Sequence, residues 1–121
     1  MSGEWREHYE DAADADLAAM SAESLPQLIR RVQRREFGEY YALWDAIAGK
    51  RDLHAVGWLM FDFITSDATY LHRYHCARAL LVLLGNSTYE AADLTVAHRE
   101  PARALAVVEQ ELVRAIGPRR A

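Results

Sequence analysis

The sequence lacks the features that mark secreted and membrane proteins. Its 121 residues include one cysteine, Cys76, which excludes an internal disulfide. Its longest apolar runs, such as residues 79–84, fall far below the roughly 20 residues needed to span a bilayer. The first residues, Met-Ser-Gly-Glu-Trp-Arg, are polar and acidic, unlike a charged-then-apolar signal segment. We therefore expect a cytoplasmic protein with no membrane partner.

Motifs for nucleotide binding, nucleic-acid binding and catalysis are also missing. The six glycines stand singly, so no glycine-rich phosphate loop exists. The formal net charge of −4 argues against nucleic-acid binding, which normally needs a basic footprint. The carboxylates are scattered among aromatics at spacings typical of a helix surface, which does not favour paired-carboxylate catalysis. We expect no catalytic residues and no cofactor.

What the sequence does contain is helical periodicity from end to end. An apolar fraction of 51% in a chain of this length suits one domain over residues 1–121 that folds without disulfides or structural metals. No stretch alternates with period two between turn signals, so no strand is expected. The pattern predicts an all-α protein of about seven short antiparallel helices, over residues 4–20, from Ser24 onward, 36–48, 53–64, 66–85, from Ser87 onward, and 102–116.

Start and stop signals support most of these helices. Ser24 precedes Leu25-Pro26, and proline is tolerated in a first turn. The stretch 66–85 is the most strongly specified, because it carries its own cap, apolar face and stop. The expected caps are Ser24, Asp52 and Ser66 or Asp67, and the expected stops are Gly49, Gly85 and Gly117-Pro118, with Arg119 and Arg120 as a frayed tail.

Charge is unevenly placed in the first third of the chain. Residues 1–20 hold six acids against one arginine, which predicts an acidic, loosely docked first helix or a partner-binding arm. Arginines follow at the end of the second helix: Arg30, Arg31, Arg34 and Arg35. They either form a solvated face that complements the helix dipole and pairs with the acidic helix, or they bind an acidic partner or phosphate.

One helical hairpin resembles a known repeat. From Asp67 the pattern continues with His72-Arg73, Cys76-Ala77, Ala79-Leu80 and Gly85. It resembles the second half of a HEAT-like repeat, in the variant found in phycobilin lyases and related families, and residues 53–64 complete the hairpin. His72 departs from the aliphatic consensus, and Leu81 replaces a common glycine. The resemblance implies an α-α superhelix that binds other macromolecules, whereas lyase activity does not follow from it.

The best candidate for a chemical site lies in the same stretch. His72 and His75 are three residues apart, so they share one helix face, with Cys76 beside them and Asp62, His54 or Asp67 as possible neighbours. No second close ligand pair exists, so we expect satisfied histidines rather than a metal site. Cys76 lies mid-helix on an apolar face, where a thiolate is not stabilised.

Nine of the twelve aromatic residues fall between residues 37 and 74. Trp58 and Phe61 either pack on the next helix or sit exposed, as anchors for a partner or for self-association into a homo-oligomer. Our leading hypothesis is a bacterial, non-catalytic helical-repeat module that binds a protein partner, as an adaptor or a toxin-neutralising immunity-type protein. The alternative is a small helical enzyme or ligand-binding protein with a pocket lined by His72, Tyr74 and His75. The candidate partner-binding residues are Tyr40, Tyr41, Trp44, Trp58, His72, Tyr74, His75, Arg30, Arg31 and Arg34.

Overall fold

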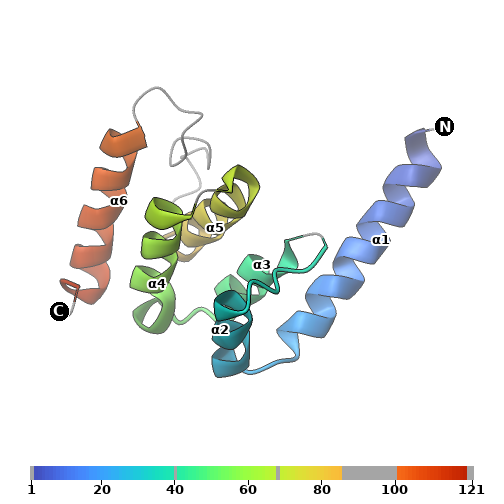
Figure 1. Ribbon diagram of the computed structural model, residues 1–121, viewed down its shortest axis with the longest axis horizontal. Coiled ribbons are helices and arrows are strands. Elements are labelled where there is room, and N and C mark those ends of the chain that lie inside the picture. Colours follow the sequence, from blue (N-terminus) through green and yellow to red (C-terminus); the bar gives the residue numbers. More distant parts are fainter. Residues whose placement is uncertain (1, 40, 68, 86–100, 120–121) are drawn as a thin grey trace. The chain divides into compact units, whose positions relative to one another are not determined.

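The computed structural model describes residues 2–39, 41–67, 69–85 and 101–119, with side chains from residue 12 in the first helix and from residue 105 in the last. All regular structure in these ranges is helical, which confirms the predicted all-α class. The helices are α1 (Ser2–Ser21), α2 (Leu25–Gln33), α3 (Ala42–Gly49), α4 (Leu53–Ser66), α5 (Tyr70–Leu83) and α6 (Pro101–Ile116) (Figure 1). The further helix predicted from Ser87 lies outside the described residues.

The chain divides into two compact units, Met1–Lys50 and Arg51–Ala121. The expectation of one domain over residues 1–121 stays a prediction. Within the described ranges, no helix combines the length and the apolar character needed to cross a membrane.

The first unit is organised around α3, against which both α1 and α2 pack. Six of the eight α3 residues are buried, whereas Asp45 and Gly49 are exposed. Ser24 caps α2 as predicted: its hydroxyl accepts from the Gln27 backbone N–H, and the Gln27 side chain accepts from the Ser24 N–H at 2.9 Å. Lys50 closes the unit by donating from Nζ to the Ser21 carbonyl at 2.8 Å.

The predicted start of the third helix at residue 36 is wrong, because α3 begins at Ala42. Three residues before it, Arg35, Gly38 and Tyr41, have positive φ angles of 58°, 85° and 58°, which right-handed helix cannot accommodate. Phe37 is nevertheless buried, since the extended segment folds its ring onto Trp44 with centroids 6.0 Å apart. The aromatic spacing therefore predicted the burial of Phe37 correctly, but the helix start that it predicted at residue 36 is wrong.

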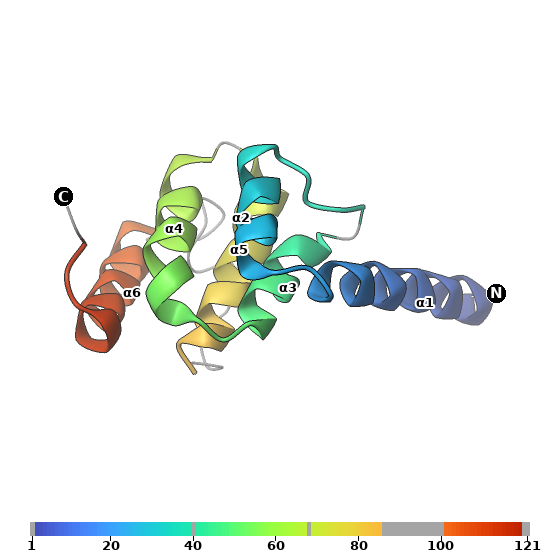
Figure 2. The ribbon, with the colours of Figure 1, turned by 90° about the horizontal axis from the view of Figure 1, so that it is seen from below.

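The second unit is organised around α4, which lies between α5 and α6 (Figures 1 and 2). Asp52 caps α4 as predicted, its side chain accepting from the Ala55 N–H at 3.2 Å. Gly57 lets α6 come close, because an added Cβ there would lie 2.9 Å from Leu112 Cδ2. The core of this unit combines residues of all three helices: Val56, Met60, Phe61, Ile64, Cys76, Ala77, Ala79, Leu80, Leu81, Val108 and Leu112.

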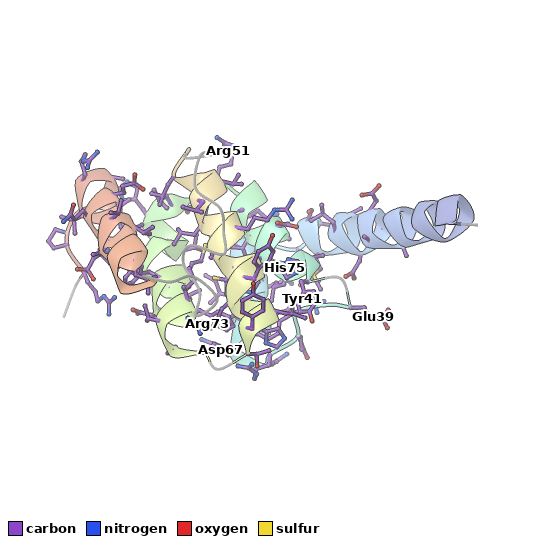
Figure 3. The ribbon with its side chains drawn as sticks, turned by 90° about the horizontal axis from the view of Figure 1, so that it is seen from above. Glu39, Tyr41, Arg51, Asp67, Arg73 and His75 are labelled. Atoms are coloured by element: carbon purple, nitrogen blue, oxygen red, sulfur yellow. The ribbon has the colours of Figure 1, made fainter. Side chains whose placement is uncertain are left out.

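The predicted cap of the 66–85 helix is also wrong. Ser66 is the last residue of α4, and the carboxylate of Asp67 accepts from the Thr69 N–H at 2.8 Å, so it closes the link between the helices. The N-cap of α5 is Thr69, whose side chain makes no capping bond. Arg73 then donates from Nε to the Ile64 carbonyl at 2.9 Å, near the α4–α5 junction where Figure 3 shows both Asp67 and Arg73.

The other end of that helix agrees with the sequence. Gly85 adopts a φ of +74° and donates its N–H to the Val82 carbonyl, and Gly117 ends α6 with a φ of +88°. The packed pair of α4 and α5 forms the expected hairpin, while its assignment as a HEAT-like repeat within a superhelix stays a prediction.

Candidate functional site

A pocket of about 530 Å³ opens on the surface of the second unit. It lies between α4 and the end of α6 with the chain that follows, and the two helices are neighbours in the ribbon of Figure 2. Three side chains of α4 line it at four-residue intervals: His54, Trp58 and Asp62. Residues four apart lie above one another on a helix, so these three form a single stripe. The chain that turns at Gly117 supplies the opposite wall, and we call the whole the Arg119 pocket: His54, Trp58, Asp62, Ile116, Pro118 and Arg119.

Arg119 makes the polar and aromatic contacts of this pocket. Its Nη2 lies 2.6 Å from Asp62 Oδ1. Its guanidinium carbon lies 5.0 Å from the centre of the Trp58 ring and 5.7 Å from that of Phe61, within the range of cation–π attraction. The expectation of a frayed tail is therefore wrong for Arg119, whereas Arg120 lies outside the described residues.

The Trp58 ring of the pocket and the neighbouring Phe61 ring are held in place by the fold. Trp58 and Phe61 meet edge to face with centroids 5.7 Å apart, and Trp58 Nε1 donates to the Gly117 carbonyl at 3.3 Å. The sequence left open whether both rings pack inside or sit exposed, and the structure separates them. Phe61 is 5% exposed and belongs to the core, whereas Trp58 is half-buried and forms a wall of the pocket.

The contacts of Arg119 are weak enough to exchange. The Arg119 and Asp62 side chains are 48% and 52% exposed, and an exposed ion pair contributes about 0 to 1 kcal/mol. Cation–π contacts at exposed sites add about 0.5 to 1 kcal/mol. The guanidinium is thus held by several interactions that are each weak.

The predicted arginine cluster lines a second pocket, of about 240 Å³, in the first unit. The central arginine of this pocket is already paired. Arg31 donates to both carboxylate oxygens of Glu23 at 2.6 to 3.0 Å and lies 3.7 Å from Glu36. The hydrogen bond from Arg31 lowers the pKa of Glu23. Arg30 and Arg34 are exposed beside this network. The fourth arginine, Arg35, lies over the Phe37 ring with its guanidinium carbon 5.3 Å from the ring centre, so Arg30 and Arg34 are the exposed members of the cluster that line this pocket.

The predicted histidine cluster is only partly assembled. His72 Nδ1 lies 3.9 Å from Asp67 Oδ1, and the Tyr74 ring meets the His75 ring edge to face at 5.4 Å. All three side chains on α5 are half-buried, and none lines either of the two pockets above. His54 and Asp62, considered as neighbours of this cluster, line the Arg119 pocket instead.

The cysteine of that stretch is buried, as predicted. Cys76 Sγ donates to the Met60 carbonyl at 3.5 Å. Burial raises the pKa of Cys76 well above its usual range, and the charge of Asp67 raises it further. The thiol stays protonated and is a poor nucleophile. In the described ranges, no three histidine, cysteine, aspartate or glutamate side chains are grouped so that they could hold a metal ion.

The aromatic candidates of the first unit differ in accessibility. Trp44 is fully buried and is part of the core in this structure. Tyr41 is half-buried and precedes α3 in a left-handed conformation, and Tyr40 lies outside the described residues. Among the aromatic candidates, Trp58 therefore combines partial exposure with a defined pocket.

From the sequence we name Trp58 as a candidate but place the polar residues of its pocket elsewhere: His54 and Asp62 beside the histidine cluster, and Arg119 in a frayed tail. The spacing of His54, Trp58 and Asp62 was a usable signal, since it places three functional side chains on one helix stripe. Arg119 gave no such signal, because its role depends on where α6 ends relative to α4. Comparison with known proteins found no matching family model, no matching curated protein and no matching solved structure.

Proposed function

We propose that this chain is a non-catalytic helical module that binds a protein partner, and that the Arg119 pocket receives a side chain of that partner. The observation that carries the proposal is the half-buried indole of Trp58, over which the Arg119 guanidinium lies while it pairs with the Asp62 carboxylate. Tryptophan and arginine are the residues most enriched among interface hot spots. The pocket volume of about 530 Å³ also falls in the range of sites that bury a ligand group.

The alternative of a small enzyme receives less support from the chemistry of the side chains. Catalysis by nucleophilic attack needs an activated group, whereas the thiol of Cys76 is buried and protonated and is therefore not activated.

The proposed partner binding agrees with the adaptor or immunity-type role and the bacterial cytoplasmic location that we expect from the sequence. An adaptor or a toxin-neutralising immunity-type protein in the bacterial cytoplasm would be small, acidic and without catalytic groups. The acidic α1, whose Asp14 is exposed, would speed encounter with a basic partner by charge complementarity. A HEAT-like arrangement around the α4–α5 hairpin would agree with this role, because α-α superhelices present extended binding surfaces.

Site-specific photocrosslinking tests the proposal. A benzophenone amino acid is placed at His54, on the pocket rim, and separately at Gln110, an exposed position on α6. In cells that naturally make this chain, we expect one adduct of discrete mass from position 54 and none from position 110. Replacing Trp58 with alanine in the His54 probe should abolish that adduct.

Other results are equally informative. Equal adducts at both positions, or none at position 54, would refute docking at the Arg119 pocket. An adduct of twice the chain mass would assign the pocket to self-association and would replace the heterologous partner with a second copy.

A further inference from the structure

The stripe on α4 has the composition of a guanidinium-binding site. Asp62 supplies a carboxylate at one end, and the rings of Trp58 and Phe61 supply two aromatic surfaces within 5.7 Å of one guanidinium carbon. Arginine suits such a site better than lysine, because its planar, weakly hydrated cation stacks on rings while it donates to a carboxylate. All three groups belong to α4, and the hydrogen bond from Trp58 Nε1 to the Gly117 carbonyl fixes the indole in place.

The occupant of this site comes from the same chain. Arg119 stands two residues after Gly117, whose φ of +88° turns the backbone at the end of α6. Its contacts with the pocket are an exposed ion pair and two cation–π contacts. Because each of these interactions is weak in water, Arg119 competes with an incoming ligand without blocking the site permanently.

We propose that the Asp62–Trp58–Phe61 site recognises an arginine side chain of the protein partner, and that Arg119 occupies it until the partner's arginine takes its place. Arg119 thus acts as an internal competitor. A ligand that needs an empty site binds with an apparent affinity equal to its intrinsic affinity multiplied by the fraction of molecules in which the site is empty. The contact set of Arg119 corresponds to an occupied-to-empty ratio of about 2 to 30.

This inference rests on the proposed function for the nature of the partner, but its binding site can be tested without one. The probe is N-acetyl-arginine methylamide, titrated into the full chain while the indole N–H signal of Trp58 is followed by NMR. We expect R119A to bind the probe about 2 to 30 times more tightly than the wild type. The double variant R119A/D62N should lose this gain, because the carboxylate that holds the guanidinium is gone.

Matched controls separate the site from general charge effects. R114A removes one exposed arginine from the last turn of α6, close to Arg119 in the sequence, and should bind the probe as the wild type does. N-acetyl-norleucine methylamide has a similar apolar stem without the cation and should not bind R119A. R119Q, which keeps part of the side chain but removes the guanidinium, replaces R119A if the alanine variant does not fold.

Three results would overturn the inference. The first is equal affinity of wild type, R114A and R119A for the arginine probe. The second is equal binding of the norleucine probe to R119A, which would make the site merely apolar. The third is binding of acetate to the wild type that R119A abolishes, which would make Arg119 the receptor of a carboxylate rather than a competitor.

The two proposals fail in distinguishable ways. If the crosslink from position 54 is absent but R119A gains affinity for the arginine probe, the guanidinium site stands and the protein partner is wrong. If the crosslink forms but the arginine probe neither binds R119A nor competes with the adduct, the partner stands and its arginine anchor is wrong.

Discussion

The close approach of α4 and α6 at Gly57 determines the shape of the second unit and can be tested by adding one methyl group. A Cβ at residue 57 would lie 2.9 Å from Leu112 Cδ2, 3.0 Å from Ile116 Cδ1 and 3.2 Å from Leu53 Cδ1. Alanine is favoured over glycine inside a helix by about 1 kcal/mol. Overpacking a core costs about 1 to 3 kcal/mol. G57A should therefore lower the free energy of unfolding by about 0 to 2 kcal/mol.

The role of Leu112 makes this prediction sharper. L112A removes a fully buried side chain and should cost about 3 kcal/mol. It also vacates the space nearest to residue 57, so that the added methyl no longer meets Leu112. In this background G57A should become neutral or stabilising by up to about 1 kcal/mol. The two sites should thus be coupled by about 1 to 2 kcal/mol.

Urea unfolding of the four proteins of this double-mutant cycle, followed by circular dichroism, measures the coupling. V113A provides the control, because Val113 is 42% exposed and its effect should be within about 0.5 kcal/mol and additive with G57A. If G57A changes stability equally, within about 0.5 kcal/mol, in the wild-type and L112A backgrounds, the packing of α4 on α6 at this point is wrong.

Three further predictions concern other parts of the chain. The buried thiol of Cys76, whose pKa is raised by burial, should react with a thiol reagent at mildly alkaline pH at least ~10-fold more slowly in the folded than in the urea-unfolded protein, and equal rates would contradict its burial. Arg31 lowers the pKa of Glu23, so the ionised Glu23 side chain stabilises the fold at any pH above the ordinary glutamate pKa of 4.5. This stabilisation is lost as the pH falls through the lower pKa of the folded state. Melting curves should show the acid-dependent loss in the wild type and a smaller loss in E23Q. G38A should destabilise the first unit by about 1 to 3 kcal/mol in urea unfolding, because Gly38 has a φ of +85° and an added Cβ would lie 2.6 Å from Asp16 Oδ2; an unchanged midpoint would refute this turn geometry.

Helix ends were predictable where a single residue determines them. Ser24 and Asp52 cap helices because their side chains accept from the first turn, and Gly85 and Gly117 end helices because glycine adopts positive φ at little cost. These signals are local, and the sequence alone carries them.

The start of α3 was not predictable in the same way. Arg35 and Tyr41 adopt left-handed conformations that non-glycine residues rarely take, so nothing in their side chains announces the break. The cap at Asp67 failed for another reason: an aspartate between two helices can cap the second or close the turn after the first, and only the geometry of the link decides.

The candidate site shows the same division. The stripe of His54, Trp58 and Asp62 follows from helix periodicity and could be predicted from the sequence. The part that Arg119 plays could not, because it is set by the contact between α4 and α6, which brings residues 62 and 119 together. Long-range placement of this kind depends on packing rather than on local pattern.

The position of Lys50 has a practical consequence. It is the last residue of the first unit and the only lysine in the chain, so a lysine-specific protease has one peptide bond to cut, between Lys50 and Arg51. A single digestion would release the two units as separate fragments with natural sequences. Spectra of the isolated and remixed fragments would then report whether each half folds alone and whether the halves recognise each other.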